Sequence, residues 1–253
     1  MSSGWTPLSD EIARWRDSGH AVEFWWRDDD AKRPDAALER LVALSARSGV
    51  PVALAVIACN AEPSLSALLG ETVCVFQHGT DHANRAAPGE KKTEFPAAEL
   101  PEAALARLAA ARERLQAVAA SHFLPVLAPP WNRLPRHLVP YLRAAGFVGL
   151  SQYGARALAE PAAGLMQVNT HLDIIDWRGT RGFIGERAAL AAAVRHLAAR
   201  RTGASEPGEP TGWLTHHAVH DAAAWDFLPR LFDFTRAIPG VSWRRAEEIF
   251  HTY

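Results

Sequence analysis

Five short segments of this chain, spread between residues 28 and 220, concentrate carboxylates and imidazoles. They are Asp28-Asp29-Asp30, His78-Gly-Thr-Asp-His82, Pro129-Pro130-Trp131-Asn132-Arg133, Asp173-Ile-Ile-Asp176-Trp177 and His216-His217-Ala-Val-His220. Carboxylates and imidazoles together can hold a divalent metal, and a spare carboxylate and a spare histidine can act as base and acid. If the fold brings the segments together, the sequence predicts a metal-dependent hydrolase.

The spacing within the first two segments supports metal binding, although each has a simpler explanation. His78 and His82 are four residues apart, which suits two ligands of one metal, but such pairs also arise by chance. Three adjacent aspartates repel one another unless a cation or hydrogen-bond donors compensate them, and the alternative is a solvated acidic turn. Both segments directly follow apolar runs of strand length, which favours a site attached to the core.

The other three segments are weaker when each is taken alone. Trp131, behind two prolines, could wall a pocket or fill the core, and Arg133 could pair with a site carboxylate. The Asp-Ile-Ile-Asp-Trp segment reads as a surface turn. The adjacent His216 and His217 favour a proton-transfer role over a structural one.

The apolar pattern predicts strands that alternate with helices. Strands are expected at residues 22–26, 50–57, 73–76, 123–127, 146–150, 165–168, from 213, and 241–243, and helices at residues 34–48, 101–120, 136–145, 186–201 and 221–237. Repeated strand–helix units indicate parallel strands with helical crossovers. Each polar segment lies at or just after the carboxyl end of an expected strand, which is the active-site face of a β/α barrel.

Length and composition fit a single domain that spans residues 1–253. The chain has 253 residues, of which 48% are apolar, enough to bury a large core. The formal net charge is −1 and there is no long basic run, so nothing indicates a nucleic-acid or membrane-surface partner. The oligomeric state is left open.

No targeting or membrane segment is expected. The first residues lack a charged stretch followed by an apolar one, and no apolar run reaches the ~18 residues that cross a bilayer. Cys59 and Cys74 lie in or beside apolar runs, which favours buried, reduced thiols and a reducing compartment such as the cytoplasm.

Taken in order, the five segments resemble the motifs of the polysaccharide deacetylase family, carbohydrate esterase family 4. That family has an Asp-Asp, a His-(Ser/Thr)-x-x-His, a Pro-aromatic, an Asp-x-x-Asp-Trp and a Leu-x-His motif on a distorted (β/α)7 barrel with parallel strands. The resemblance covers about residues 22–250. It implies this α/β fold, with one divalent metal, zinc in most such enzymes, and hydrolysis of an N-acetyl group on an amino sugar or acetylated glycan.

Roles for individual residues also follow from the resemblance. Ligands of the metal would be Asp30, His78 and His82, and Asp29 would be the base. The remaining expected site residues are the acid His216, Asp176 to orient or balance the catalytic groups, Trp131 and Trp177 as pocket walls, Asn132 as a substrate contact, and Arg133 as a catalytic cation. The oxyanion would lie on the metal and a backbone N–H such as that of Trp131.

Departures from the family pattern leave alternatives open. The aspartate pair is either Asp28 with Asp29 or Asp29 with Asp30, and the acid is either His216 or His217. Gly79 stands where the family has Ser or Thr. Ala128 stands where the family has an arginine, and we expect Arg133 to supply that cation by pairing with Asp176 or the base. Two other functions remain: hydrolysis of a non-sugar amide or cyclic imide on the same barrel, and a non-catalytic carbohydrate-binding module.

Overall fold

The computed structural model describes residues 4–250 of the chain. No secretion signal is expected from the sequence in the first residues of the chain. Residues 1–3 of that stretch lie outside the described residues. Among the described helices, none combines the length and the apolar character needed to cross a bilayer.

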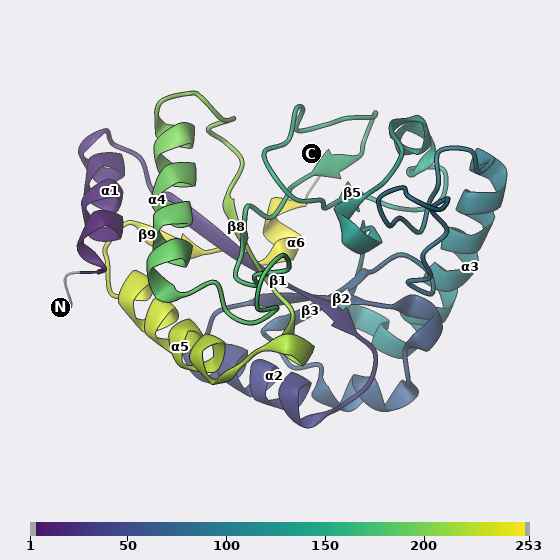
Figure 1. The fold of residues 1–253 in the computed structure, drawn as a ribbon, viewed down its shortest axis with the longest axis horizontal. Coiled ribbons are helices and arrows are strands. Elements are labelled where there is room, and N and C mark those ends of the chain that lie inside the picture. The colour runs from purple at the N-terminus through teal and green to yellow at the C-terminus, as the bar shows by residue number, and fades with distance from the viewer. Residues whose placement is uncertain (1–3, 251–253) are drawn as a thin grey trace.

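The centre of the molecule is one parallel sheet curled into an incomplete barrel (Figure 1). Its strands are β1 (Val22–Ala31), β2 (Val52–Val56), β3 (Val73–Gln77), β4 (Phe123–Leu127), β5 (Gly149–Leu150), β6 (Met166–Gln167), β7 (Leu172–Asp173), β8 (Thr211–Thr215) and β9 (Val241–Trp243). Their order is β6-β5-β4-β3-β2-β1-β8-β7, with β9 paired to β1. Every pairing between these strands is parallel, so the expected distorted barrel with parallel strands is confirmed.

Helices surround the outside of the sheet, as Figure 1 shows for α2, α3, α4 and α5. The α-helices are α1 (Thr6–Asp17), α2 (Ala36–Ser48), α3 (Pro101–Ala119), α4 (Glu186–Arg201), α5 (Ala222–Arg236) and α6 (Ala246–Ile249), and the 3-10 turns are Ala58–Asn60, Pro63–Leu68, Ala120–His122, Pro130–Asn132, Arg136–Tyr141 and His217–Val219. The expected α-helix at 136–145 is wrong: a 3-10 turn forms there instead, with Pro140 inside it, where an α-helix would lose a hydrogen bond. Helices α1 and α6 and strand β7 were not anticipated.

The ends of two helices are set by the residues that the sequence suggests. Asp221 caps α5 by accepting a hydrogen bond from the Ala224 N–H, at 2.8 Å. Gly49 ends α2 with φ of 65°, a left-handed conformation that glycine adopts without steric cost. Asp221 thus marks where the chain enters α5 after β8, and Gly49 marks where it leaves α2 toward β2.

Strand β1 divides the core and carries the aspartates. Phe24 and Trp26 pack outward against the helices, while Trp25 points into the barrel. The strand does not end before the aspartates, as the sequence suggested, but continues through all three to Ala31. Asp28 is paired on both sides, with Leu54 of β2 and Thr215 of β8, which keeps the acidic segment extended.

A β-bulge near the end of β1 sends two adjacent carboxylates toward the same side. Between Asp28 and Ala31 the register with β2 shifts by one residue, and Asp30 has φ of 74°. In a regular strand Asp29 and Asp30 would face opposite sides of the sheet. The extra residue reorients Asp30, so both carboxylates reach one cavity.

Candidate active site

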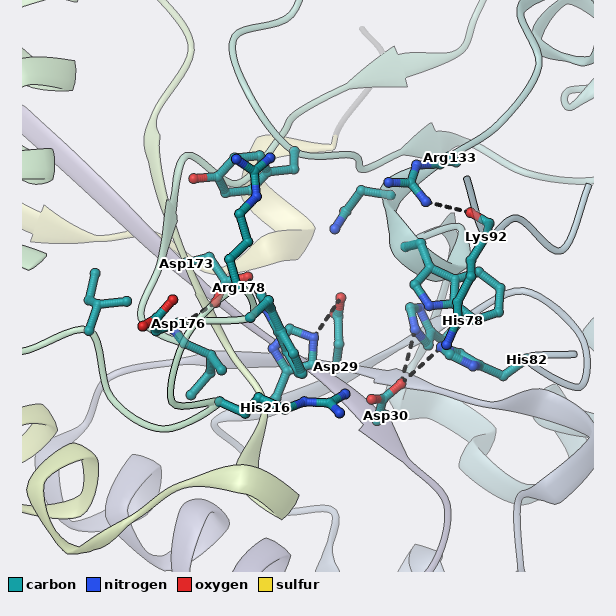
Figure 2. A pocket seen from close by; sticks show the side chains of 17 residues that line it. Asp29, Asp30, His78, His82, Lys92, Arg133, Asp173, Asp176, Arg178 and His216 are labelled. Atoms are coloured by element: carbon teal, nitrogen blue, oxygen red, sulfur yellow. Dashed lines mark hydrogen bonds and ion pairs between the residues drawn. The ribbon is translucent and has the colours of Figure 1, made fainter. Parts of the chain in front are cut away.

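A cavity of about 880 Å³ opens at the carboxyl ends of the strands and gathers residues from all five polar segments. The expected site residues that line it are Asp29, Asp30, His78, His82, Trp131, Asn132, Arg133, Asp176, Trp177 and His216. Figure 2 shows two groups in this cavity: Asp30 with the two histidines, and Asp29 with His216. The expectation that the segments meet in space agrees with this geometry.

The first group has the donor set of a metal centre. The Nε2 atoms of His78 and His82 both lie 3.3 Å from Oδ1 of Asp30, and one ligand atom from each residue falls within 4.8 Å of the others (Figure 2). That Asp30 oxygen is buried without a hydrogen-bond partner. Two imidazole nitrogens and a carboxylate oxygen facing one point, with a buried oxygen unsatisfied, fit a divalent ion such as zinc.

A hydrogen bond to the backbone orients the His78 ring so that its Nε2 faces Asp30. Its Nδ1 lies 2.8 Å from the carbonyl oxygen of Ala128, which requires the Nδ1–H to donate and leaves the Nε2 lone pair facing Asp30. Thus Ala128, which stands where the family has an arginine, contributes its backbone. Burial acts to raise the pKa of the Asp30 carboxyl, but His78 and the nearby imidazoles outweigh it and hold that pKa below its ordinary value.

The second group is a carboxylate clamped by an arginine that the sequence reading overlooked. Arg27 donates to Asp29 through Nε, at 2.8 Å from Oδ1, and through Nη2, at 3.0 Å from Oδ2. It also donates to Asn132 Oδ1 at 2.7 Å and to Ser151 Oγ at 2.7 Å, and it is 0% exposed. Such a two-pronged contact fixes the orientation of Asp29. Oδ2 of Asp29 is 4.0 Å from His216 Nε2.

The expectation that Arg133 pairs with Asp176 or the base is wrong. Its guanidinium donates to the carbonyl oxygen of Lys92, at 2.6 Å, and within residues 4–250 it forms no ion pair. Trp131 and Asn132, just before it, have φ of 55° and 57°, and this left-handed bend carries Arg133 to the rim of the cavity. The cation that pairs with Asp29 is Arg27.

Asp176 is engaged in a turn, whereas Asp173 lies close enough to His216 and Asp29 for their charges to act on it. The two oxygens of Asp176 accept hydrogen bonds from the N–H groups of Gly179 and Thr180, at 2.9 and 3.2 Å. Asp173 lines the cavity, and its Oδ2 accepts a hydrogen bond from the Trp177 indole at 2.8 Å. Burial raises the pKa of Asp173, and the charge of His216 opposes that rise. Of the two aspartates, Asp173 is therefore the one linked to His216 through Trp177.

The aromatic residues lie where the sequence suggested. The Trp131 ring centre is 4.4 Å from that of His82, and the Trp177 ring meets His216 edge-on at 4.7 Å. Trp177 is 40% exposed, so much of its surface is open to a ligand. Asn132 lines the cavity, and its Oδ1 accepts a hydrogen bond from Arg27, so it supports the contact between Arg27 and Asp29.

The residues of the two alternatives that the sequence left open lie in different surroundings. Asp28 is 0% exposed and accepts hydrogen bonds from the Thr215 hydroxyl at 2.6 Å and the His217 N–H at 3.0 Å, while its other oxygen meets His217 Nδ1. Neither Asp28 nor His217 lines the cavity, whereas Asp29 and His216 do. The hydrogen bonds between Asp28 and His217 join β1 to the segment that directly follows β8.

A buried glutamate beneath the His78–His82 loop was also missed. Glu94 is 0% exposed; its Oε1 accepts hydrogen bonds from the Thr80 N–H, at 2.8 Å, and from the Thr80 hydroxyl. A side chain on Gly79 would overlap Glu94 Oε2 and approach Pro130 Cδ at 2.5 Å. This explains why glycine replaces the family's Ser or Thr there.

Replacing Glu94 with alanine should weaken metal binding by ~10-fold to ~100-fold, the usual effect of losing a group that orients metal ligands. The change leaves the Thr80 N–H without its acceptor and opens a cavity under the loop that carries both histidines. Glu94→Gln, which keeps an acceptor oxygen of the same size, should lose much less. Chelator competition measures the affinity, and an unchanged value in Glu94→Ala would show that the loop holds its shape without the carboxylate.

Comparisons with known proteins identify the fold. No protein-family model and no curated protein sequence matches the chain. Among solved structures, a Puue allantoinase is 14% identical with a TM-score of 0.64, over 92% of this chain and 90% of that one. A probable polysaccharide deacetylase from Pseudomonas aeruginosa PAO1 is 15% identical with a TM-score of 0.63, over 92% and 91%.

A third similar structure is a family 4 acetyl xylan esterase from Clostridium thermocellum in complex with a cobalt ion. It is 15% identical with a TM-score of 0.51, and the match covers 90% of each chain. The chain therefore has the fold of the polysaccharide deacetylases and family 4 carbohydrate esterases, as the resemblance of its motifs implied.

Proposed function

We propose that this protein is a divalent-metal-dependent hydrolase that removes an N-acetyl group from an amino sugar or an acetylated glycan. One observation carries the proposal: Asp29, clamped by Arg27 and 4.0 Å from His216, lies in the same cavity as the Asp30, His78 and His82 cluster. A base, an acid and a metal donor set thus share one cavity. The fold shared with polysaccharide deacetylases adds support.

The reaction divides between the two groups of the site. A divalent ion held by Asp30, His78 and His82 would supply Lewis-acid polarisation of the acetyl carbonyl and ease the formation of hydroxide. Asp29 takes the proton of the attacking water, and the Arg27 clamp keeps its carboxylate aimed into the cavity. His216 then gives a proton to the leaving nitrogen, so that the C–N bond breaks to yield acetate and a free amine.

The surroundings of His216 suit an acid that must face the substrate. Trp177 covers one side of the imidazole, and Trp177 is itself held by Asp173 through the indole N–H. The Nδ1 of His216 is buried without a hydrogen-bond partner. We propose that Asp173, whose charge acts on His216, balances the imidazolium while Nε2 faces Asp29.

Hydrolysis of a non-sugar amide or cyclic imide is the second candidate, and the likeness to an allantoinase structure favours keeping it. The same base and acid would serve either substrate, because both reactions add water to an acyl carbon bound to nitrogen. Ring opening of a cyclic imide releases no acetate, and this difference separates the two candidates.

Metal-loaded protein should release acetate from one or more members of a panel of N-acetylated sugars and oligosaccharides. A chelator should abolish the release and added zinc should restore it, since the donor set fits that ion. Enzymatic acetate detection and free-amine labelling measure the two products. Ring opening of cyclic imides without acetate release from any sugar would favour the second candidate, and no hydrolysis of either class would contradict the proposal.

A further inference from the structure

The loop between β7 and α4 brings two arginines to the cavity. Arg178 and Arg181 both line it, although neither belongs to the base, the acid or the metal donor set. Both are exposed, and within residues 4–250 neither takes part in an ion pair. Two guanidinium groups without carboxylate partners at an active-site cavity are free to bind an anion.

The loop that carries these arginines is tightly held. The N–H of Asp176 donates to the Gly182 carbonyl at 2.8 Å, and the N–H of Arg181 donates to the Asp176 carbonyl at 2.9 Å. The Asp176 carboxylate accepts from the two N–H groups inside the turn, as described above. At its base the loop is attached to α5, because the Phe183 N–H donates to Asp221 Oδ2 at 2.9 Å.

Close packing explains both glycines of this loop. A side chain on Gly179 would overlap the Asp176 carboxylate, and one on Gly182 would approach Asp221 Oδ2 at 2.6 Å. Arg181 has φ of 58°, a left-handed conformation that is uncommon for a residue with a side chain. Backbone in such conformations is found where the surroundings hold it and often serves a binding site. The backbone that carries both arginines is therefore held in place at the cavity.

Within residues 4–250, no carboxylate of the cavity forms an ion pair with these two arginines. The carboxylates that line the cavity have other partners: Arg27 for Asp29, the two histidines for Asp30, the Trp177 indole for Asp173 and the turn for Asp176. The opposite side of the rim adds Lys92 and Arg133, and no ion pair joins either of them to a carboxylate within the part of the chain that the structure describes. In Figure 2, Arg178 and Arg133 lie on different sides of Asp29.

We propose that the substrate carries an anionic group, a carboxylate or a phosphate, apart from the acetamido group, and that Arg178 and Arg181 bind it. This inference rests on the proposed deacetylation and names the class of substrate. A guanidinium donates two parallel hydrogen bonds to either oxyanion, and a cavity with cations at its rim attracts an anionic ligand from solution. Lys92 and Arg133 add to that attraction from the far side.

Matched substrates test the proposal in the metal-loaded protein. N-acetylglucosamine, its 6-phosphate and N-acetylmuramic acid share the acetamido sugar and differ in the anionic group. We expect kcat/KM to be at least ~10-fold higher for an anionic compound than for the neutral sugar, the effect of one or two charged hydrogen bonds. Which compound is preferred shows whether the site takes phosphate or carboxylate.

The variants Arg178→Gln, Arg181→Gln and their combination should lower the ratio of anionic to neutral kcat/KM by ~10-fold or more, mostly through KM. Arg47→Gln is the control: this exposed arginine lies in the last turn of α2, at the opposite end of the strands, and its loss should leave the ratio unchanged. Equal kcat/KM for the three compounds, or an unchanged ratio in the double variant, would overturn the inference and leave the deacetylase proposal intact.

A binding measurement decides the inference even if none of the three compounds is hydrolysed. Inorganic phosphate and succinate, titrated separately into metal-loaded wild-type and double-variant protein, can be followed by calorimetry. Since both proteins contain the same metal site, the difference between them reports the two arginines. At least one probe should bind ~10-fold more weakly to the double variant. The proposal would be contradicted if neither probe bound the wild type, or if each probe bound the wild type and the double variant equally. Failure of hydrolysis alone would count only against the deacetylase function.

Discussion

Replacing Asp29 with asparagine should lower turnover by ~10²-fold or more and leave the metal content unchanged, because a positioned proton acceptor contributes about that much. The side chain keeps its size, and Arg27 can still donate to the remaining carbonyl oxygen, so the pocket should stay folded. The amide cannot take a proton from water. Initial rates of acetate release, together with metal analysis of the same sample, measure both quantities.

Asp28→Asn is the matched control for this result, since it makes the same chemical change one residue earlier on the same strand. Asp28 faces away from the cavity and accepts hydrogen bonds from Thr215 and His217. Its replacement should lower thermal stability, because a buried contact is lost, and should have a much smaller effect on kcat. If Asp28→Asn were the inactive variant and Asp29→Asn the active one, the assignment of the base would be wrong by one residue.

Most of the fold could be predicted from apolar patterning, because the helices and the buried strands follow simple periods. Strand β4 and helix α4 match the expected ranges at both ends. Helix α1 was overlooked although Leu8, Ile12 and Trp15 form a regular buried stripe on it. The incorrect helix at 136–145 shows that an apolar period does not outweigh an internal proline.

The candidate site was partly predictable from the sequence. The errors concern where side chains point in the fold rather than which residue types form the site. Arg27 could have been found, because residues two apart on a strand share a face and Asp29 follows at that distance. Arg133 was placed wrongly because nothing in the sequence predicts the left-handed backbone conformation of Trp131 and Asn132. Glu94 lies in a long loop without any periodic pattern, so only the structure brings it beneath Thr80.

The Asp173 and Asp176 pair illustrates the same limit. Both belong to one short motif, and the family resemblance directed attention to Asp176. In the structure the chain turns sharply after Trp177, and Asp176 is required to satisfy that turn. Asp173, at the end of β7, accepts hydrogen bonds from the Ile175 N–H and the Trp177 indole, and Trp177 in turn meets His216. Both aspartates line the cavity, and their hydrogen-bond partners, which the sequence does not reveal, decide which of them is linked to His216.

Replacing either His78 or His82 with alanine should remove most of the bound metal. Each imidazole supplies one of the three protein donors that face a single point, and the remaining two donors bind a divalent ion far less tightly. His78 is nearly buried and its ring is fixed by the Ala128 carbonyl, whereas His82 is partly exposed. We therefore expect the larger loss for His78→Ala.

Two measurements check this expectation independently of activity. Elemental analysis after dialysis against a defined zinc buffer gives occupancy. The rise in Tm on adding zinc reports binding to the folded state, and that rise should be present in the wild type and absent or much reduced in both variants. His137→Ala, which removes an exposed imidazole from the Arg136–Tyr141 turn, is the control and should bind zinc as the wild type does. Full occupancy in both His78→Ala and His82→Ala would disprove the assigned donor set, because neither imidazole would then be needed to hold the ion.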